Sequence, residues 1–240
     1  MKRFAIFAVS MIAAAGMVFA QTEVGATDPA AVGPVVAQQE LVEVSVDRFE
    51  AEGGWESSIA RDVGVISSRL FNGGPEAKQP IPAEQGMDIR DQTVLGVRVD
   101  FTRRGHHSFF VRAVRPIPIE GVTRTVSVWV AGRNANHRLS LMVRDMYGRQ
   151  HTIRMGTLNF QGWQQMTATI PPQPIVGTNG VMQRNTRNSN QRMGLEIIGF
   201  RVDTDPVESF GSYFVYFDDL RAVTDLFALS RDPDDMVDNW

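Results

Sequence analysis

The sequence predicts an all-β protein, folded as an antiparallel β-sandwich of jelly-roll type. Many short runs alternate between apolar and polar residues, which is the period of a half-buried strand. Turns rich in Gly, Pro and Asn separate these runs. Beyond residue 20, no segment shows a convincing helical period of 3.6 residues. Short strands with polar turns are typical of sandwiches and barrels.

Residues 1–20 have the pattern of a secretory signal peptide. Two basic residues precede an uncharged apolar run from Phe4 to Ala20. A charged region, an apolar region and a small-residue site predict cleavage after Ala20. A membrane anchor is the alternative, but the run is short for a span and no basic residues follow it. The polar segment 21–40, which contains proline, is expected to be a flexible N-terminal arm.

The absence of cysteine constrains the class of protein. None occurs in the 240 residues, so disulfides, thiol chemistry and cysteine zinc sites are excluded. An exported chain of this size without disulfides must be stabilised by its core. We therefore expect a periplasmic protein whose β-sandwich domain occupies residues 41–225.

The strands of this domain are expected wherever the alternation is clear. The predicted strands are 41–46, 63–71, 95–101, 109–114, 125–131, 139–143, 151–155, 165–170, 195–202 and 212–223. Pro116 and Pro118 are expected to end the strand 109–114, because proline lacks an amide hydrogen. Segment 79–92 is expected to be a surface loop.

Segment 212–223 is predicted to be a central strand of a sheet. Residues 213–217 form an unbroken aromatic and β-branched run. With a period of two, Asp218 is expected on the same face as Phe214, Tyr216 and Leu220, and Asp219 is expected at the surface. A carboxylate on an apolar face requires a partner. Asp218 is a weak candidate ligand for structural calcium, and a hydrogen-bonded or arginine-paired role is an alternative.

Charge is unevenly distributed along the chain. Residues 98–192 hold 14 arginines, no lysine and three acidic residues, whereas residues 21–97 hold 13 acidic and 5 basic residues. Residues 193–240 hold 11 acidic residues and 3 arginines. One interpretation is ordinary surface pairing between interleaved segments. The other is contact between an arginine-rich face and an acidic face of two subunits. An exported acidic protein disfavours nucleic acid as the partner.

The acidic tail, residues 226–240, contains four aspartates and Trp240. Because tryptophan is a large apolar group, we expect the tail to dock on its own domain or on a neighbour, with a solvated tail as the alternative. The candidate interface residues are Arg103, Arg104, Arg184, Arg187, Arg192, Asp234, Asp235 and Trp240.

Motifs for catalysis are absent from the sequence. It has no nucleophile elbow, P-loop or dinucleotide fingerprint, and its four histidines, expected at the surface, lack the spacing of a helical zinc site. We expect no enzymatic activity, no cofactor and no metal beyond the weak Asp218 candidate. Sugar binding is better supported, because Trp129 and Trp163 are possible stacking platforms, unless loops or a neighbour cover them. A glycoside hydrolase is a weaker hypothesis, since it needs two opposed carboxylates.

Several motifs together resemble a known family. They are Trp129-Val-Ala-Gly-Arg-Asn134, Arg144-Asp-Met-Tyr-Gly148, Leu158-Asn-Phe-Gln-Gly-Trp163, Ile170-Pro171, Tyr216-Phe-Asp-Asp-Leu220 and the segment 232–240. Across nearly all of the chain after the signal peptide, they resemble FlaA, the flagellar filament outer layer (sheath) protein of spirochaetes. Some of these motifs are shared with carbohydrate-binding and galactose-binding-like sandwiches, which implies the same fold class.

The resemblance implies a structural subunit that coats the flagellin core of periplasmic flagella. Its partners would be core flagellin and other sheath subunits, including copies of itself, with no nucleic acid and no membrane after signal cleavage. It would contribute to filament stiffness, shape and motility. The alternative hypothesis is a periplasmic carbohydrate-binding module that acts through Trp129 and Trp163.

Overall fold

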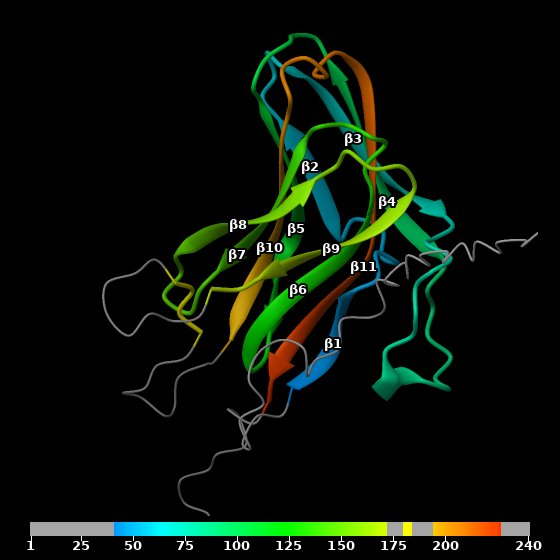
Figure 1. Ribbon diagram of the computed structural model, residues 1–240, viewed down its shortest axis with the longest axis vertical. Coiled ribbons are helices and arrows are strands. Elements are labelled where there is room, and N and C mark those ends of the chain that lie inside the picture. Colours follow the sequence, from blue (N-terminus) through cyan, green and yellow to red (C-terminus); the bar gives the residue numbers. More distant parts are fainter. Residues whose placement is uncertain (1–40, 172–179, 184–193, 227–240) are drawn as a thin grey trace, which may run out of the picture.

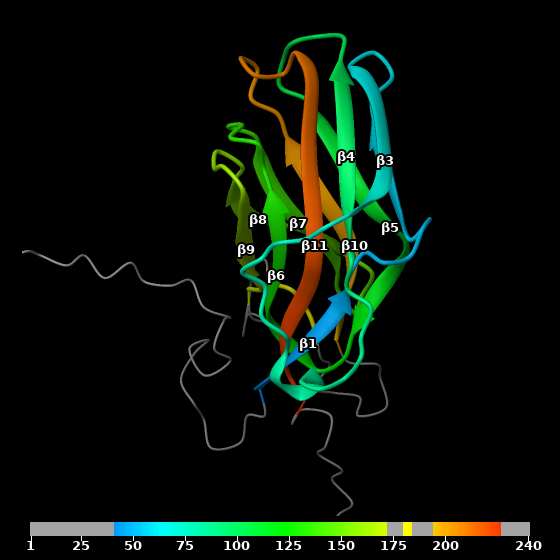
Figure 2. The ribbon, with the colours of Figure 1, turned by 90° about the vertical axis from the view of Figure 1, so that its right-hand side faces the viewer.

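The computed structural model describes residues 41–171, 180–183 and 194–226. Two antiparallel sheets, one of six strands and one of five, pack face to face (Figures 1 and 2). Within the described residues the one helical element is a single 3-10 turn, η2 (Pro82–Glu84). The predicted all-β antiparallel sandwich is therefore confirmed.

The six-stranded sheet has the strand order β3–β4–β11–β6–β9, and β1 also pairs with β11. Its strands are β1 (Leu41–Asp47), β3 (Gly64–Asn72), β4 (Thr93–Phe101), β6 (Val122–Ala131), β9 (Trp163–Thr169) and β11 (Gly211–Asp225). The five-stranded sheet has the order β2–β5–β10–β7–β8. Its strands are β2 (Trp55–Ile59), β5 (Ser108–Ile119), β7 (Arg138–Arg144), β8 (Gln150–Thr157) and β10 (Leu195–Asp203).

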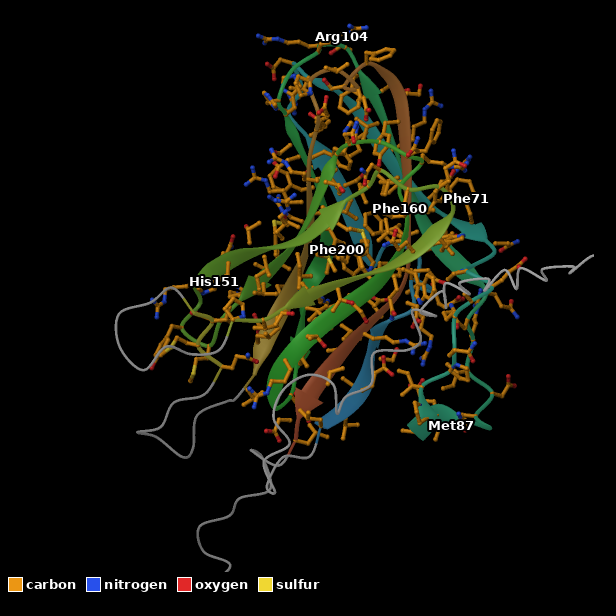
Figure 3. All side chains as sticks on the ribbon, in the orientation of Figure 1. Phe71, Met87, Arg104, His151, Phe160 and Phe200 are labelled. Atoms are coloured by element: carbon orange, nitrogen blue, oxygen red, sulfur yellow. The ribbon has the colours of Figure 1, made fainter. Side chains whose placement is uncertain are left out.

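Strand β11 is central to the larger sheet, as predicted. One edge pairs with β4 over residues 211–217 and with β1 over residues 220–225, while the other edge pairs with β6. Its inward side chains enter the core, where the ring of Phe217 stacks on Phe200 from β10 with centroids 4.9 Å apart. Figure 3 labels Phe200 within the sandwich. Burying each such side chain contributes roughly 1.5–3 kcal/mol.

The two prolines do not end β5, contrary to the prediction. The strand continues to Ile119 and pairs with β10 on both sides of a register shift. Strand β2, however, pairs with β5 only as far as Ala113. Pro116 and Pro118 therefore lie beyond the reach of β2, where a missing amide hydrogen removes no bond to that strand.

Residues 73–92, which we call the strap, connect β3 to β4 and cross β11 on the outer face of the six-stranded sheet (Figure 2). Most strap side chains are exposed, in line with the predicted loop. Ile81 is an exception, with 2% of its surface exposed. Arg221 also donates a hydrogen bond to the carbonyl oxygen of Gln79, which ties the strap to β11.

Gly199 allows a close approach between β10 and β5. The registers of β10 with both neighbouring strands shift between Ile197 and Gly199, and Gly199 has φ of 148°. A Cβ atom there would lie 2.2 Å from the carbonyl oxygen of Val111. Only glycine is compatible with that backbone geometry and that distance.

We predict that Gly199→Ala lowers the free energy of unfolding by about 4 kcal/mol, because backbone strain and a steric clash add together. Gly148→Ala is the matched control, since Gly148 also has a positive φ, of 79°, but has open space around it. The control should lose only about 1–2 kcal/mol. Urea unfolding would measure both values, and equal losses would show that the approach of β10 to β5 imposes no constraint.

Candidate interaction surface

A β-bulge in β11 determines which way its acidic residues point. The register with β6 shifts between Asp218 and Arg221, and Asp219 has φ of 52°. Phe217 and Leu220 both join the core as a result. Asp218 instead meets the strap, so the prediction that it shares a face with Leu220 is wrong. The prediction that Asp219 is a surface charge is also wrong, because its exposed fraction is 1%.

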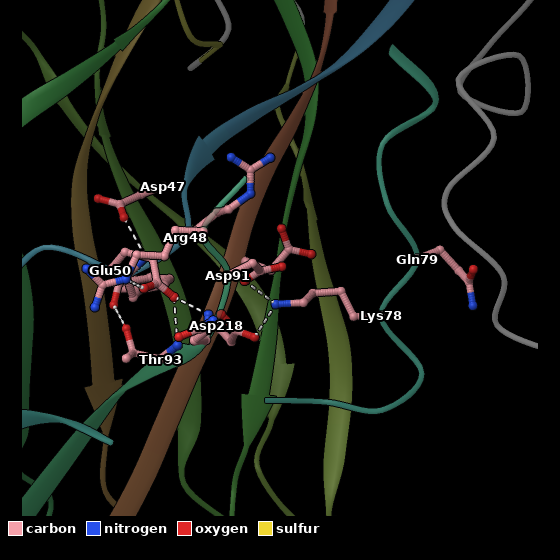
Figure 4. Close-up of polar contacts among 12 residues, drawn as sticks. Asp47, Arg48, Glu50, Lys78, Gln79, Asp91, Thr93 and Asp218 are labelled. Atoms are coloured by element: carbon pink, nitrogen blue, oxygen red, sulfur yellow. Dashed lines mark hydrogen bonds and ion pairs between the residues drawn. The ribbon is translucent and has the colours of Figure 1, made fainter. Parts of the chain in front are cut away.

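Two cations neutralise the carboxylates at the bulge. Lys78 from the strap places its Nζ atom 2.7 Å from Asp218 and 2.6 Å from Asp91 (Figure 4). Arg221 lies 2.7 Å from Asp219 and 3.6 Å from Glu43 on β1. The two groups of ion pairs join β1, β11 and the strap.

Burial dominates the ionisation of Asp218. Removal from water raises its pKa from 3.8 to about 6, although Lys78 acts in the opposite direction. Burial also acts to lower the pKa of Lys78, but its bonds to Asp218 and Asp91 outweigh that effect and leave the pKa raised. At neutral pH, Asp218 is therefore a buried anion that depends on the Lys78 ammonium group.

The described residues contain no cluster of three or more His, Asp or Glu side chains suited to a metal ion. The partner of Asp218 is Lys78. This places Asp218 in a structural tie between the sheet and the strap. The expectation that the histidines lie at the surface fails for His137, which is fully buried against Tyr213 with ring centroids 4.5 Å apart.

Beyond the strap, the outer face of the six-stranded sheet carries aromatic rings. Phe71 and Tyr216 lie over Gly96, where a Cβ atom would be 2.4 Å from the Phe71 ring and 2.9 Å from the Tyr216 ring. The two rings meet edge to face with centroids 5.7 Å apart. Phe214 is exposed two residues earlier on β11. Glycine at position 96 thus lets both rings lie close to the sheet.

Three arginines stack on these rings. The guanidinium carbon of Arg69 lies 4.6 Å from the Phe71 centroid, and that of Arg133 lies 5.2 Å from the Tyr216 centroid. Arg98 lies 5.7 Å from the Phe214 centroid. We call these six residues the arginine–aromatic face: Arg69, Phe71, Arg98, Arg133, Phe214 and Tyr216. Stacked guanidinium groups retain N–H donors that can bind carboxylates.

The two tryptophans proposed for sugar stacking lie in different environments. Trp129 is 9% exposed and pairs in register with Asp218, the residue to which the strap is tied. Trp163 is half-buried and pairs with Ala131, which in turn pairs with Tyr216. Trp163 therefore extends the row of residues that contains Tyr216.

The predicted interface arginines that the structure describes lie at one end of the sandwich. Arg103 and Arg104 are exposed in the β4–β5 loop, and Figure 3 labels Arg104 at that end. Arg103 lies 3.6 Å from Asp62, and Arg104 stacks on Phe210 at 4.4 Å. The other predicted interface residues lie outside the described residues: Arg184, Arg187, Arg192, Asp234, Asp235 and Trp240.

The arginine–aromatic face was missed by sequence reasoning. Its signal is partly visible, because Phe214 and Tyr216 are two residues apart, as are Arg69 and Phe71, and each pair shares a strand face. What brings Arg69 and Tyr216 into one row is pairing with Gly96 on the intervening strand β4. Strand order of this kind cannot be taken from alternation alone.

The fold and these surfaces define a β-sandwich with an exposed aromatic and basic face. Residues 19–233 match the family described as flagellar filament outer layer protein FlaA. The chain belongs to this family, so the resemblance predicted from its motifs is confirmed. No helix among the described residues is long and apolar enough to cross a membrane.

Relatives in three spirochaetes carry related names. A flagellar filament outer layer-like protein of Brachyspira hyodysenteriae is 36% identical over 196 residues, which is 81% of this chain and 85% of the relative. The flagellar filament outer layer protein of Spirochaeta aurantia is 25% identical over 60% of this chain and 50% of its own length. That of Treponema pallidum is 30% identical over 46% of this chain and 31% of its own length.

Solved structures similar to this chain include carbohydrate-binding modules. A family 11 module from Clostridium thermocellum, bound to a mixed-linked tetrasaccharide, has a TM-score of 0.40 and 11% identity over 76% of this chain and 96% of the module. TmCBM61, bound to β-1,4-galactotriose, has a TM-score of 0.37 and 12% identity over 72% of this chain and 89% of the module. TM-scores of this size indicate a distant likeness.

We predict that Lys78→Met lowers the free energy of unfolding by about 3 kcal/mol at about pH 7.5, because it leaves a buried carboxylate without its cation. The pKa of Asp218 is raised above 3.8 to about 6, so the stability linked to its protonation is present at low pH and is lost as pH rises through about 6. At about pH 5 the carboxyl holds a proton in the folded protein, and the cost of the substitution should shrink.

Asp218→Asn combined with Lys78→Met is the matched control. The double variant should recover most of the lost stability at about pH 7.5, because no buried anion remains. Urea unfolding followed by tryptophan fluorescence at both pH values would measure the effect. An equal loss at both values, or no recovery in the double variant, would refute the dependence of Asp218 on Lys78.

Proposed function

We propose that this protein is a non-catalytic outer layer subunit that coats the flagellin core of a periplasmic flagellar filament. The observation that carries the proposal is the family match, which spans residues 19–233 and so includes all eleven strands that the structure describes. Its partners in this proposal are core flagellin and further copies of the subunit. Its site of action is the periplasm, in keeping with the signal-peptide pattern of residues 1–20.

The construction of the domain suits a coat subunit. Ion pairs through Lys78 and Arg221 tie β1, β11 and the strap into one unit. A subunit whose elements are fixed in this way transmits a bending load to its neighbours instead of deforming internally. A layer of such subunits around a core would stiffen the filament and influence its shape, and through these properties motility.

The first test is the location of the protein in the cell. We expect it to co-purify with periplasmic flagella and to be lost from them when its gene is disrupted, with a thinner and more easily bent filament as the result. Immunoblots and electron microscopy of purified filaments would measure this, with core flagellin as the loading control. Absence of the protein from filaments of wild-type cells would rule out the coat function.

A second candidate function is a periplasmic carbohydrate-binding module. The observation in its favour is the row of Trp163 and Tyr216 on the outer face of the six-stranded sheet, since aromatic rings on a sheet can stack on sugars. A glycan array should then give a saturable signal that Trp163→Ala weakens strongly. Trp129→Ala should have less effect, because Trp129 is 9% exposed. An array without signal would remove this candidate.

A further inference from the structure

The arginine–aromatic face has unused capacity for binding anions. Arg98 has a carboxylate partner, Asp100, at 2.9 Å. Arg69 and Arg133 are exposed. Within the described part of the chain, Arg69 stacks on Phe71, Arg133 stacks on Tyr216, and neither pairs with a carboxylate. A surface with two such arginines and aromatic rings between them is suited to a ligand that is both acidic and apolar.

The chain itself contains a segment with this chemistry. Residues 232–240 hold four aspartates together with Met236, Val237 and Trp240. Aspartates can accept hydrogen bonds from the stacked guanidinium groups, while the apolar side chains can pack on the rings of Phe71 and Tyr216. Segment 232–240 is therefore complementary to the arginine–aromatic face in both charge and apolar character.

We propose that the arginine–aromatic face binds the acidic segment 232–240 of a second copy of this chain. The inference rests on the proposed coat function, for which it supplies a contact between neighbouring subunits. Arg69 and Arg133 pair with aspartates of the incoming segment, and the Phe71 and Tyr216 rings receive its apolar residues. Each copy then offers a face to one neighbour and a segment to another.

The geometry of β11 favours a second copy over the same copy. The segment follows the end of β11 at Asp225, whereas Tyr216 lies nine residues earlier in that strand, about 30 Å away. Between these points the strap is tied to Asp218 and Arg221. The segment of the same copy would have to pass over the strap to reach the face. Binding to a neighbour requires no such crossing and produces an open chain of subunits.

Self-association of the full exported chain tests the proposal. Sedimentation velocity should show the average mass rising with protein concentration, and the association should weaken as salt rises from about 50 mM to about 500 mM. The variant Arg69→Glu/Arg133→Glu should associate at least about tenfold more weakly. Neutralising the segment by Asp232→Asn, Asp234→Asn, Asp235→Asn and Asp238→Asn should have a similar effect without altering the sandwich.

Mixing the two variants tests directly whether the face of one copy binds the segment of another. The segment of the face variant is intact, and so is the face of the segment variant. An equimolar mixture should therefore form one-to-one pairs, although each variant alone associates only weakly. If the segment binds its own face, the wild-type protein stays monomeric at every concentration, which overturns the proposal. A mixture that stays monomeric overturns it as well, because the face of one copy then does not bind the segment of another.

The opposite sheet supplies a matched control. Arg138 and Arg154 are exposed on β7 and β8 of the five-stranded sheet, and neither forms an ion pair with another residue that the structure describes. Arg138→Glu/Arg154→Glu makes the same charge change and should leave association unchanged. Loss of association in this control, or full association of the face variant with an unchanged unfolding temperature, would contradict the assignment. A glycan that binds the face and is lost in the face variant, with association unaffected, would assign the face to sugar instead.

Failure of the proposed contact between subunits can be distinguished from failure of the proposed coat function. If the protein is found on filaments while the face variant still self-associates, the coat function stands and the contact is wrong. If the protein associates as described but is missing from filaments, the contact stands and the coat function is wrong.

Discussion

The buried ion pairs at the bulge of β11 are the interaction on which the rest of this fold depends. β11 passes through the centre of the six-stranded sheet, and its two acidic residues at the bulge are almost completely removed from water. Without Lys78 and Arg221, the carboxylates of Asp218 and Asp219 would be unpaired in the interior. The same cations hold the strap against the sheet. Burying these charges costs free energy, but their ion pairs and hydrogen bonds fix the position of the long connection between β3 and β4.

Alternation and turn chemistry were sufficient to predict most of the sandwich, and the failures have physical causes. The strand β2 was not predicted, because Trp55-Glu-Ser-Ser-Ile59 has only its end residues apolar. The period of two could not anticipate the bulge at Asp219, since a positive φ leaves no mark on the pattern of side chains. The partner of Asp218 was also out of reach, because Lys78 lies in a segment without strand signal and approaches only through the course of the strap.

The position of the arginine–aromatic face could not be predicted from the sequence. The arginine-rich segment 98–192 suggested contact between subunits, and this stays a prediction; Arg103 and Arg104 within it are exposed. The stacked arginines Arg69 and Arg133, however, come from opposite sides of the sheet centre, and Arg69 lies outside the basic segment. Their common environment is created by Gly96, whose missing side chain makes room for the rings they contact. The order of the strands in the sheet determines which of these residues become neighbours, and the alternation of apolar and polar residues does not reveal that order.

The pairing of β1 with β11 has a consequence for any assembly of this domain. Leu41 is the register partner of Asp225, so the chain enters and leaves the sandwich at one pole. Arg104 lies at the opposite pole (Figure 3). The two poles of the domain therefore differ from each other, so the domain has a defined direction along its long axis. A polymer made from it by repeated identical contacts would have a direction along its length, and a label fused to residue 41 or residue 225 would mark the same pole of every subunit.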